Sequence, residues 1–246
     1  MVLGRSARRA LQSIGLLLVT LALIAAQGSS MSLFDAYSAN QASQQAAGKA
    51  YVGKQSLDFG PFAAALTSLT AERIAELDRL LQGTPVAAIQ DLLASGTVSS
   101  LEITTYYIER IRRIDADRHN TILELNPEAL DIAAALDVER AAGHVRGPLH
   151  GIPVTLKGNI ATGDRMHTSA GAYVLKDAYA DRDAFIVTRL REAGAVILGK
   201  NNLSEWANYY AVRSVNGFSV LGGFTRNPHG PFDVGGSSSG SCAAVW

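Results

Sequence analysis

Two short apolar segments separated by a helical stretch constrain the fold of this chain more than any other feature. Residues 152–156 and 195–198 are apolar and rich in β-branched side chains, and residues 183–193 between them follow a helical pattern. Apolar runs of this length are typical of buried strands. A strand, a crossover helix and a second strand indicate an α/β fold with parallel strands.

Further elements surround this unit. Three amphipathic helices are predicted before it: one after Thr70 that ends at Gly83, one opened by Thr84 and Pro85, and one opened by a capping box of Ser99 and Glu102. A short strand is expected at residues 121–125, followed by a helix that runs to about residue 142. We assign the helices a packing role and place one domain at residues 63–246.

The N-terminus has the pattern of a targeting segment. Arginines 5, 8 and 9 precede an apolar run at residues 14–26 and then small residues, which predicts a signal peptide over residues 1–28. Because thirteen apolar residues are short for a membrane span, cleavage and export to the periplasm or the medium are expected, with no stable membrane anchor. If translation begins at Met31, the protein is instead cytoplasmic. Residues 29–62 are rich in Ala, Ser and Gln and are expected to be a poorly ordered lead-in.

Composition removes several classes of function. The chain has 22 basic and 22 acidic residues, so charge gives no argument for a nucleic-acid partner. The single cysteine, Cys242, excludes an intramolecular disulfide and is expected to serve packing. The five histidines show no metal-ligand spacing, so we expect neither a metal nor another cofactor.

Residues 235–241 combine three glycines with four serines. Such a run is unfavourable inside a helix or strand and predicts a loop, with a buried helix starting at Cys242. A loop of this kind at a helix N-terminus presents N–H groups and hydroxyls to an anion or a developing oxyanion. Two other interpretations remain: a phosphate-binding loop, although no Lys-Ser/Thr pair follows the last glycine, and a flexible linker.

Lys157 directly follows the first apolar strand, where ligand sites of open parallel sheets lie. The chain has five lysines against seventeen arginines, so this lysine is not part of a generally lysine-rich surface. Partial desolvation would lower its pKa toward that of a general base, a role closed to arginine. Lys200 follows the second apolar strand and is the rival, and a lysine that merely extends to solvent is the plain alternative.

The chain resembles the amidase signature family of serine hydrolases from about Ser99 to its last residue. The matching segments come in the family's order: GIPVTLK at 151–157, AGAVILGK at 193–200, NLSEWAN at 202–208, TRNP at 225–228 and GGSSSGS at 235–241. The resemblance implies a mixed α/β sheet flanked by helices and a Ser-Ser-Lys triad that cleaves amides through an acyl-enzyme. It implies that Lys157 is the base and that Ser237, held in a cis peptide after Gly235 and Gly236, bridges it to the nucleophile.

Ser238 is expected to donate a hydrogen bond beside the reacting groups or to contact the substrate, while Ser239 and Ser241 are expected in the loop and the helix cap. In the family the nucleophilic serine lies beyond the bridging serine, and this sequence ends at Trp246. We therefore expect the N-terminal portion of an amidase, with an incomplete fold and no activity of its own. The parent's substrate would be a small-molecule or peptide amide. Two alternatives stay open: an amidase like the A subunit of glutamyl-tRNA amidotransferase, and a catalytically inactive binding protein.

Overall fold

The computed structural model describes residues 51–210 and 214–245. The predicted signal peptide and residues 29–50 of the lead-in lie outside this part. In chain order the elements are η2 (Gly60–Phe62), α3 (Ala63–Ser68), α4 (Ala71–Leu81), α5 (Val86–Ala94), α6 (Ser100–Arg110), η3 (Ile111–His119), β1 (Ile122–Leu125), α7 (Ala129–Ala141), β2 (Pro153–Lys157), η4 (Tyr173–Leu175), α8 (Phe185–Glu192), β3 (Val196–Asn201), η5 (Glu205–Asn208), β4 (Phe218–Ser219), β5 (Gly223–Phe224) and α9 (Ser239–Ala244).

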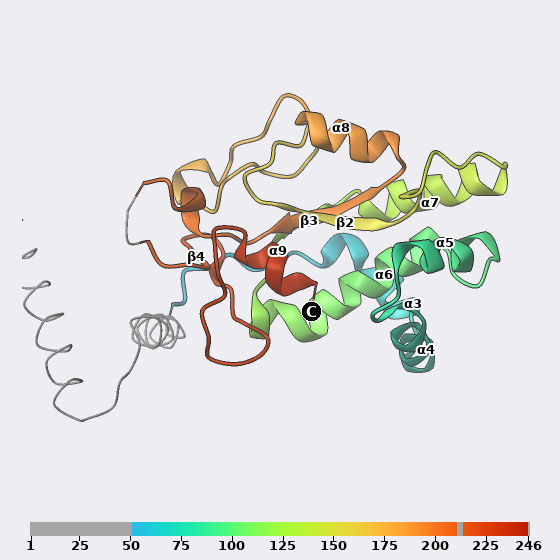
Figure 1. Cartoon of the computed structure of the whole chain (residues 1–246), viewed down its shortest axis with the longest axis horizontal. Coiled ribbons are helices and arrows are strands. Elements are labelled where there is room, and N and C mark those ends of the chain that lie inside the picture. Colours follow the sequence, from blue (N-terminus) through green and yellow to red (C-terminus); the bar gives the residue numbers. More distant parts are fainter. Residues whose placement is uncertain (1–50, 211–213, 246) are drawn as a thin grey trace, which may run out of the picture.

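A three-stranded mixed sheet lies at the centre, in the order β1-β3-β2. β2 runs parallel to β3, as the strand-helix-strand pattern predicts, and β1 pairs with β3 in the antiparallel direction. Helix α8 covers one face of the sheet, while α6 and α9 lie on the other (Figure 1). The predicted α/β class with a mixed sheet flanked by helices is therefore confirmed.

Side chains of β3 alternate between two apolar clusters. Val196 and Leu198 pack with residues of α6 and α7, such as Ile108, whereas Ile197 packs with Val187 of α8. All of these side chains are buried. This alternation is the two-residue period of a strand and explains why residues 196–198 of β3 are all apolar.

A β-bulge interrupts this alternation where the reactive end of the sheet begins. Val154 pairs with Ile197, but the next residue of β2 pairs with Gly199, so Leu198 is an extra residue in β3. A bulge shifts the side-chain parity of the longer strand by one. Lys200 and Asn201 therefore face opposite to what simple alternation from Leu198 would give.

The helices before the sheet begin close to where the sequence places them. The Thr70 hydroxyl accepts from the backbone N–H of Arg73, and the Ser99 hydroxyl accepts from that of Glu102. The capping box is only half formed, because the Glu102 carboxylate binds the Arg73 guanidinium, with Nε to Oε1 at 2.6 Å. Pro85 caps α5 instead of being its first residue.

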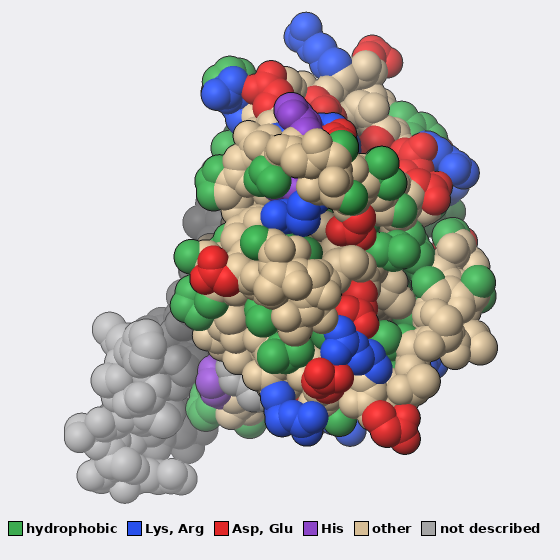
Figure 2. Space-filling model, turned by 90° about the vertical axis from the view of Figure 1, so that its right-hand side faces the viewer, with side chains coloured by type: hydrophobic (Ala, Val, Ile, Leu, Met, Phe, Trp, Pro, Cys, Tyr) green, Lys and Arg blue, Asp and Glu red, His purple; other side chains and the backbone are tan. Residues whose placement is uncertain are grey.

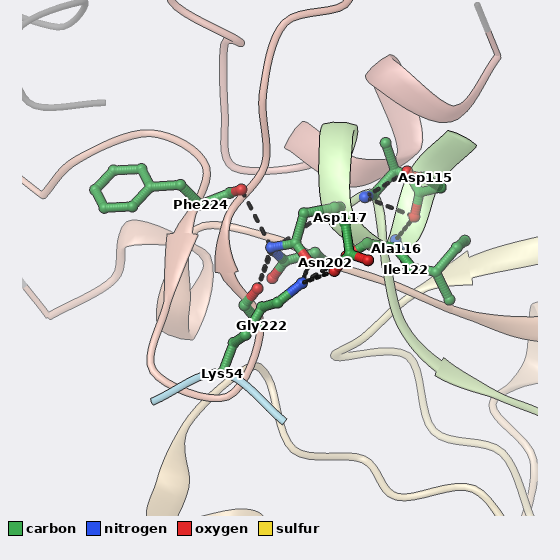
Figure 3. Close-up of polar contacts among 10 residues, drawn as sticks. Lys54, Asp115, Ala116, Asp117, Ile122, Asn202, Gly222 and Phe224 are labelled. Atoms are coloured by element: carbon green, nitrogen blue, oxygen red, sulfur yellow. Dashed lines mark hydrogen bonds and ion pairs between the residues drawn. The ribbon is translucent and has the colours of Figure 1, made fainter. Parts of the chain in front are cut away.

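The expected lead-in ends earlier than the sequence suggests. Phe62 is buried in the main apolar cluster, and the Gln55 backbone N–H donates to the Leu221 carbonyl at 2.8 Å. The Lys54 ammonium donates to the Ala116 carbonyl at 2.5 Å and lies 3.8 Å from the Asp117 carboxylate (Figure 3). These partners are far away in sequence, so local composition could not indicate them.

The surface carries charges of both signs. Acidic and basic side chains are interspersed over the face that Figure 2 shows, which lies at the right of Figure 1. Within residues 51–210 and 214–245, no helix has the length and hydropathy needed to cross a bilayer.

Candidate active site

Lys157 and Ser237 meet on the face of the sheet that α9 covers. Lys157 is the last residue of β2, and its ammonium Nζ donates a hydrogen bond to Ser237 Oγ at 2.6 Å. The peptide bond between Gly236 and Ser237 is cis, the geometry that the family resemblance implies. The structure thus brings together the two residues that the sequence singles out as catalytic.

The environment of Lys157 shifts its protonation equilibrium toward the neutral amine. Partial burial lowers the pKa of Lys157 below its ordinary value, and the nearby Cys242 offsets part of that effect. Within the described residues, no Asp or Glu carboxylate is among the groups that shift this pKa. An amine in this position can act as a general base at a lower pH than a solvated lysine.

Lys200, the rival, lies on the other face of the sheet. Its ammonium is fully buried and donates to the Ile160 carbonyl at 2.6 Å. Burial lowers the pKa of Lys200 to about 8, and Asp164 and Glu124 partly oppose this effect. Lys200 is therefore a buried structural cation, and its side chain is directed away from Ser237.

The loop that carries Ser237 is tied down on both sides of this residue. The Ser237 carbonyl accepts from the backbone N–H of Ser204 at 3.0 Å, and the Gly235 carbonyl accepts from the Ser239 hydroxyl at 2.8 Å. Gly235 has a φ of 70°, which glycine adopts without cost. The Ser237 hydroxyl is thus presented by a backbone with little freedom.

Helix α9 starts earlier than predicted. It spans Ser239–Ala244, so Ser239 and Ser241 are helical where a loop was expected up to Ser241. The Gly240 N–H donates to the Asn202 carbonyl, and a Cβ on Gly240 would lie 2.4 Å from the carbonyl oxygens of both Asn202 and Thr121. The close approach of the helix to the sheet, which a propensity argument cannot see, explains this start.

Asn202 is a site-forming residue that the sequence analysis did not assign. It follows β3, is fully buried, and its Nδ2 donates to the Gly223 carbonyl at 3.1 Å while its Oδ1 accepts from the Ser219 hydroxyl at 2.7 Å. Figure 3 shows Asn202 between the β4–β5 turn and the segment that leads to β1. The available signal was the run of polar residues 200–202 directly after an apolar strand.

Cys242 and Ser238 lie in and just before the short helix α9. Cys242 is exposed and therefore is not the buried packing residue that its apolar neighbours indicated. The Ser238 side chain does not cap α9. Its expected role as a donor or substrate contact stays a prediction.

A sizeable pocket of the described residues lies beside this site and not at it. It has a volume of about 680 Å³, and its lining includes Tyr107, Ile111, Thr155 and Val245 but neither Lys157 nor Ser237. We place the reactive centre at the hydrogen-bonded pair, because Lys157 and Ser237 carry the amine and the hydroxyl that the reaction needs. The pocket contains neither residue and offers mainly apolar contact. No group of three or more His, Cys, Asp or Glu side chains in residues 51–210 and 214–245 is arranged to hold a metal ion.

A lysine hydrogen-bonded to a serine at the end of a mixed α/β sheet is an arrangement that can transfer a proton between an amine and a hydroxyl. The family model described as Amidase matches residues 102–245, more than half of the chain. The chain therefore belongs to the amidase family.

Individual relatives agree with this assignment. A Schizosaccharomyces pombe protein named provisionally as an amidase is 43% identical over 166 residues, covering 67% of this chain and 28% of that protein. The peptide amidase of Stenotrophomonas maltophilia is 48% identical with a TM-score of 0.63, covering 65% of this chain and 33% of that structure. The A subunit of the glutamyl-tRNA(Gln) amidotransferase of Thermobifida fusca is 43% identical over 154 residues, covering 62% of this chain and 30% of that protein.

The chain corresponds to a part of these relatives. It spans between 28% and 36% of the length of four curated proteins that match it. The structural match covers a similar share, 36% in the case of an amidase family protein from Bacillus anthracis that has a TM-score of 0.69 and 41% identity.

Proposed function

We propose that the protein to which this chain belongs hydrolyses carbon–nitrogen amide bonds through a serine acyl-enzyme. The observation that carries the proposal is the 2.6 Å hydrogen bond between Lys157 Nζ and Ser237 Oγ. Membership of the amidase family supports it. In this proposal Lys157 is the general base and Ser237 passes protons between Lys157 and a nucleophilic serine.

Each proton has a defined place in the reaction. Neutral Lys157 takes the hydroxyl proton of Ser237 while Ser237 Oγ takes the proton of the nucleophile, whose oxygen attacks the amide carbon. The protonated Lys157 then returns a proton through Ser237 to the leaving nitrogen, and the C–N bond breaks. Water attacks the acyl-enzyme with the same pair as base, which releases the carboxylic acid and restores the serine.

We place the nucleophile and the oxyanion donors beyond Trp246 in the complete protein. The support is that the chain spans about a third of the length of its relatives. Removal of a single oxyanion donor costs roughly 10²–10³ in kcat. The 246-residue segment by itself is accordingly proposed to be inactive.

The proposed substrates are small linear amides and peptide amides. The 48% identity to a peptide amidase supports this substrate class. This scheme needs no metal or other cofactor, because the general base Lys157 and the proton-bridging Ser237 are side chains of the protein.

The test uses the protein isolated from its source. Its intact mass is compared with the 26.0 kDa of this sequence, and its hydrolysis of simple and C-terminal peptide amides is followed by release of ammonia. We expect a larger mass, amide hydrolysis, and a loss of turnover in Ser237→Ala. A mass equal to this sequence with or without residues 1–28, or undiminished hydrolysis by Ser237→Ala, would overturn the proposal and favour a binding protein.

A second candidate is an amidase that supplies ammonia to an amidotransferase, because the A subunit of the Thermobifida fusca enzyme is 43% identical. The same Lys157 and Ser237 would then act on glutamine. Glutamine-dependent ammonia release that needs a partner protein would support this candidate. Hydrolysis of peptide amides by the protein alone would oppose it.

Export is part of the proposal. Its support is the arginine-rich N-terminus followed by the apolar run at residues 14–26. N-terminal sequencing of the protein isolated from its source tests this: a start near residue 29 agrees with export, and a start at Met31 in the cytoplasm contradicts it.

A further inference from the structure

Asn216 and Asp233 form a hydrogen-bonded pair directly behind the loop that carries Ser237. The Asn216 amide Nδ2 lies 3.3 Å from Asp233 Oδ1 and 3.2 Å from Oδ2, and donates to this carboxylate. Asp233 Oδ1 also accepts from the backbone N–H of Gly235 at 2.7 Å. One carboxylate thus joins the Asn216 side chain to the backbone two residues before Ser237.

Asn216 also packs against the peptide that precedes Ser237. A Cβ on Gly236 would lie 2.4 Å from Asn216 Oδ1 and 2.9 Å from Ser204 Oγ. The amide oxygen of Asn216 therefore fills the space beside the cis peptide between Gly236 and Ser237.

Asn216 is itself fixed from behind. Its Oδ1 accepts from Asn208 Nδ2 at 3.1 Å, and the Asn208 side chain accepts from the Ser214 hydroxyl at 2.7 Å. Asn227 Nδ2 donates to the Asp233 carbonyl at 3.0 Å, which holds the other end of the pair. The pair is thus one link in a chain of side-chain hydrogen bonds, and both polar atoms of the Asn216 side chain have a partner.

We infer that Asn216 and Asp233 are positioning residues that set where the Ser237 hydroxyl lies relative to Lys157. The inference rests on the proposed function of Ser237 as a proton bridge. Proton transfer requires hydrogen-bond distance, and small displacements of a reacting group are costly. Neither side chain needs to touch the substrate for this role.

The geometry allows a test by exchange of the two side chains. In the double variant Asn216→Asp/Asp233→Asn, the new Asn can accept from the Gly235 N–H and donate to the new Asp, which can still accept from Asn208. In the single variant Asn216→Asp, two carboxylates face each other, and neither can donate a hydrogen bond to the other. The exchange therefore restores a hydrogen bond between the two side chains, which the single change removes.

The experiment measures kcat and KM for amide hydrolysis by the complete protein, together with thermal unfolding. We expect Asn216→Asp to lower kcat at least tenfold with little change in KM, and the double variant to recover kcat to within about threefold of the wild type, an interaction of the kind that double-mutant cycles detect. Normal kcat in folded Asn216→Asp, or a double variant as slow as the single one although its melting temperature is restored, would overturn the inference. If Asn216→Asp does not fold, Asp233→Ala, which removes the acceptor of the Gly235 N–H, is measured in its place, and normal kcat there is equally contrary.

Failure of the proposed function gives a different result. In that case the wild-type protein does not hydrolyse amides, or Ser237→Ala is as active as the wild type. An active wild type, an inactive Ser237→Ala and a fully active Asn216→Asp would refute the positioning role alone.

Discussion

Lys157 is the last residue of β2 and Lys200 is the last but one of the neighbouring parallel strand β3, yet their ammonium groups lie on opposite faces of the sheet. Lys157 donates to Ser237 on the α9 face, whereas Lys200 donates to the Ile160 carbonyl on the α8 face. The extra residue Leu198 in β3 produces this difference, because it reverses the side-chain parity of the strand before Lys200. Only one of the two lysines can therefore serve a serine in the loop before α9.

The first prediction compares these two lysines in the complete protein. Lys157→Met is expected to lower kcat/KM by roughly 10²–10⁴, the usual contribution of a general base. Lys157→Arg should be equally slow, because a guanidinium stays protonated and cannot accept the proton. Lys200→Met is the matched control and should keep the wild-type order of magnitude at temperatures well below its melting point. Substantial activity of Lys157→Arg would show that the charge and not proton transfer is what the reaction needs.

The second prediction concerns the pH dependence of amide hydrolysis. A general base must be deprotonated to act, so kcat/KM should rise with pH as Lys157 loses its proton. Because burial lowers the pKa of Lys157, the midpoint of this ascending limb should lie below about 10.4, the ordinary value for lysine. Cys242 raises this pKa, so Cys242→Ala should move the midpoint to lower pH. Rates measured across the alkaline range in both proteins provide the check. A midpoint at or above the ordinary value, or a shift upward in Cys242→Ala, would contradict the proposed environment.

The third prediction concerns stability and uses Lys200. Its pKa is about 8 in the folded protein, below that of the unfolded chain, so the unfolded state binds more protons between these values. The free energy of unfolding should therefore rise with pH from 8 to 10, by up to about 3 kcal/mol if Lys200 acted alone. Denaturant unfolding at several pH values measures this, and only the part of the slope that disappears in Lys200→Met is assigned to Lys200.

Tyr106 and Tyr107 define the upper limit of that pH window. Burial raises the pKa of both phenols, so their ionisation on unfolding opposes the effect of Lys200 above their ordinary value. An unchanged slope in Lys200→Met between pH 8 and 10 would mean that Lys200 is not the group responsible.

The parts of the fold that follow from local sequence patterns could be predicted. Thr70 and Ser99 cap their helices, the two apolar segments form parallel strands, and Lys157 ends the first of them, because each of these features depends on neighbouring residues. The choice between Lys157 and Lys200 could not be made from strand periodicity, since a bulge depends on pairing with β2.

Contacts between distant segments were the other source of difference. The early start of α9 depends on how closely Gly240 approaches Asn202, which lies 38 residues earlier in the numbering. The position of residues 51–62 depends on hydrogen bonds to distant acceptors, such as the carbonyls of Ala116 and Leu221. Composition and periodicity report on neither, because they describe one segment at a time.

The last prediction tests the contact between α9 and the sheet. In an open helix Gly→Ala would be stabilising by about 1 kcal/mol. At Gly240 the added Cβ would lie 2.4 Å from the backbone oxygens of Asn202 and Thr121, so helix and sheet must separate. We expect Gly240→Ala to lower the free energy of unfolding by about 3 kcal/mol, at the upper end of the cost of overpacking, and to lower kcat because Ser237 moves with α9.

Gly83→Ala is the matched control for that experiment. Gly83 has a φ of 69°, and a Cβ added there would meet no atom within 4 Å, so its substitution costs only the left-handed backbone, about 1 kcal/mol, and leaves Ser237 in place. Thermal and denaturant unfolding give the stabilities of both variants, and amide hydrolysis gives their turnover. If Gly240→Ala proves as stable as the wild type and as active as Gly83→Ala, then α9 does not pack against Asn202 as closely as the structure has it, and the positioning of Ser237 must come from the loop alone.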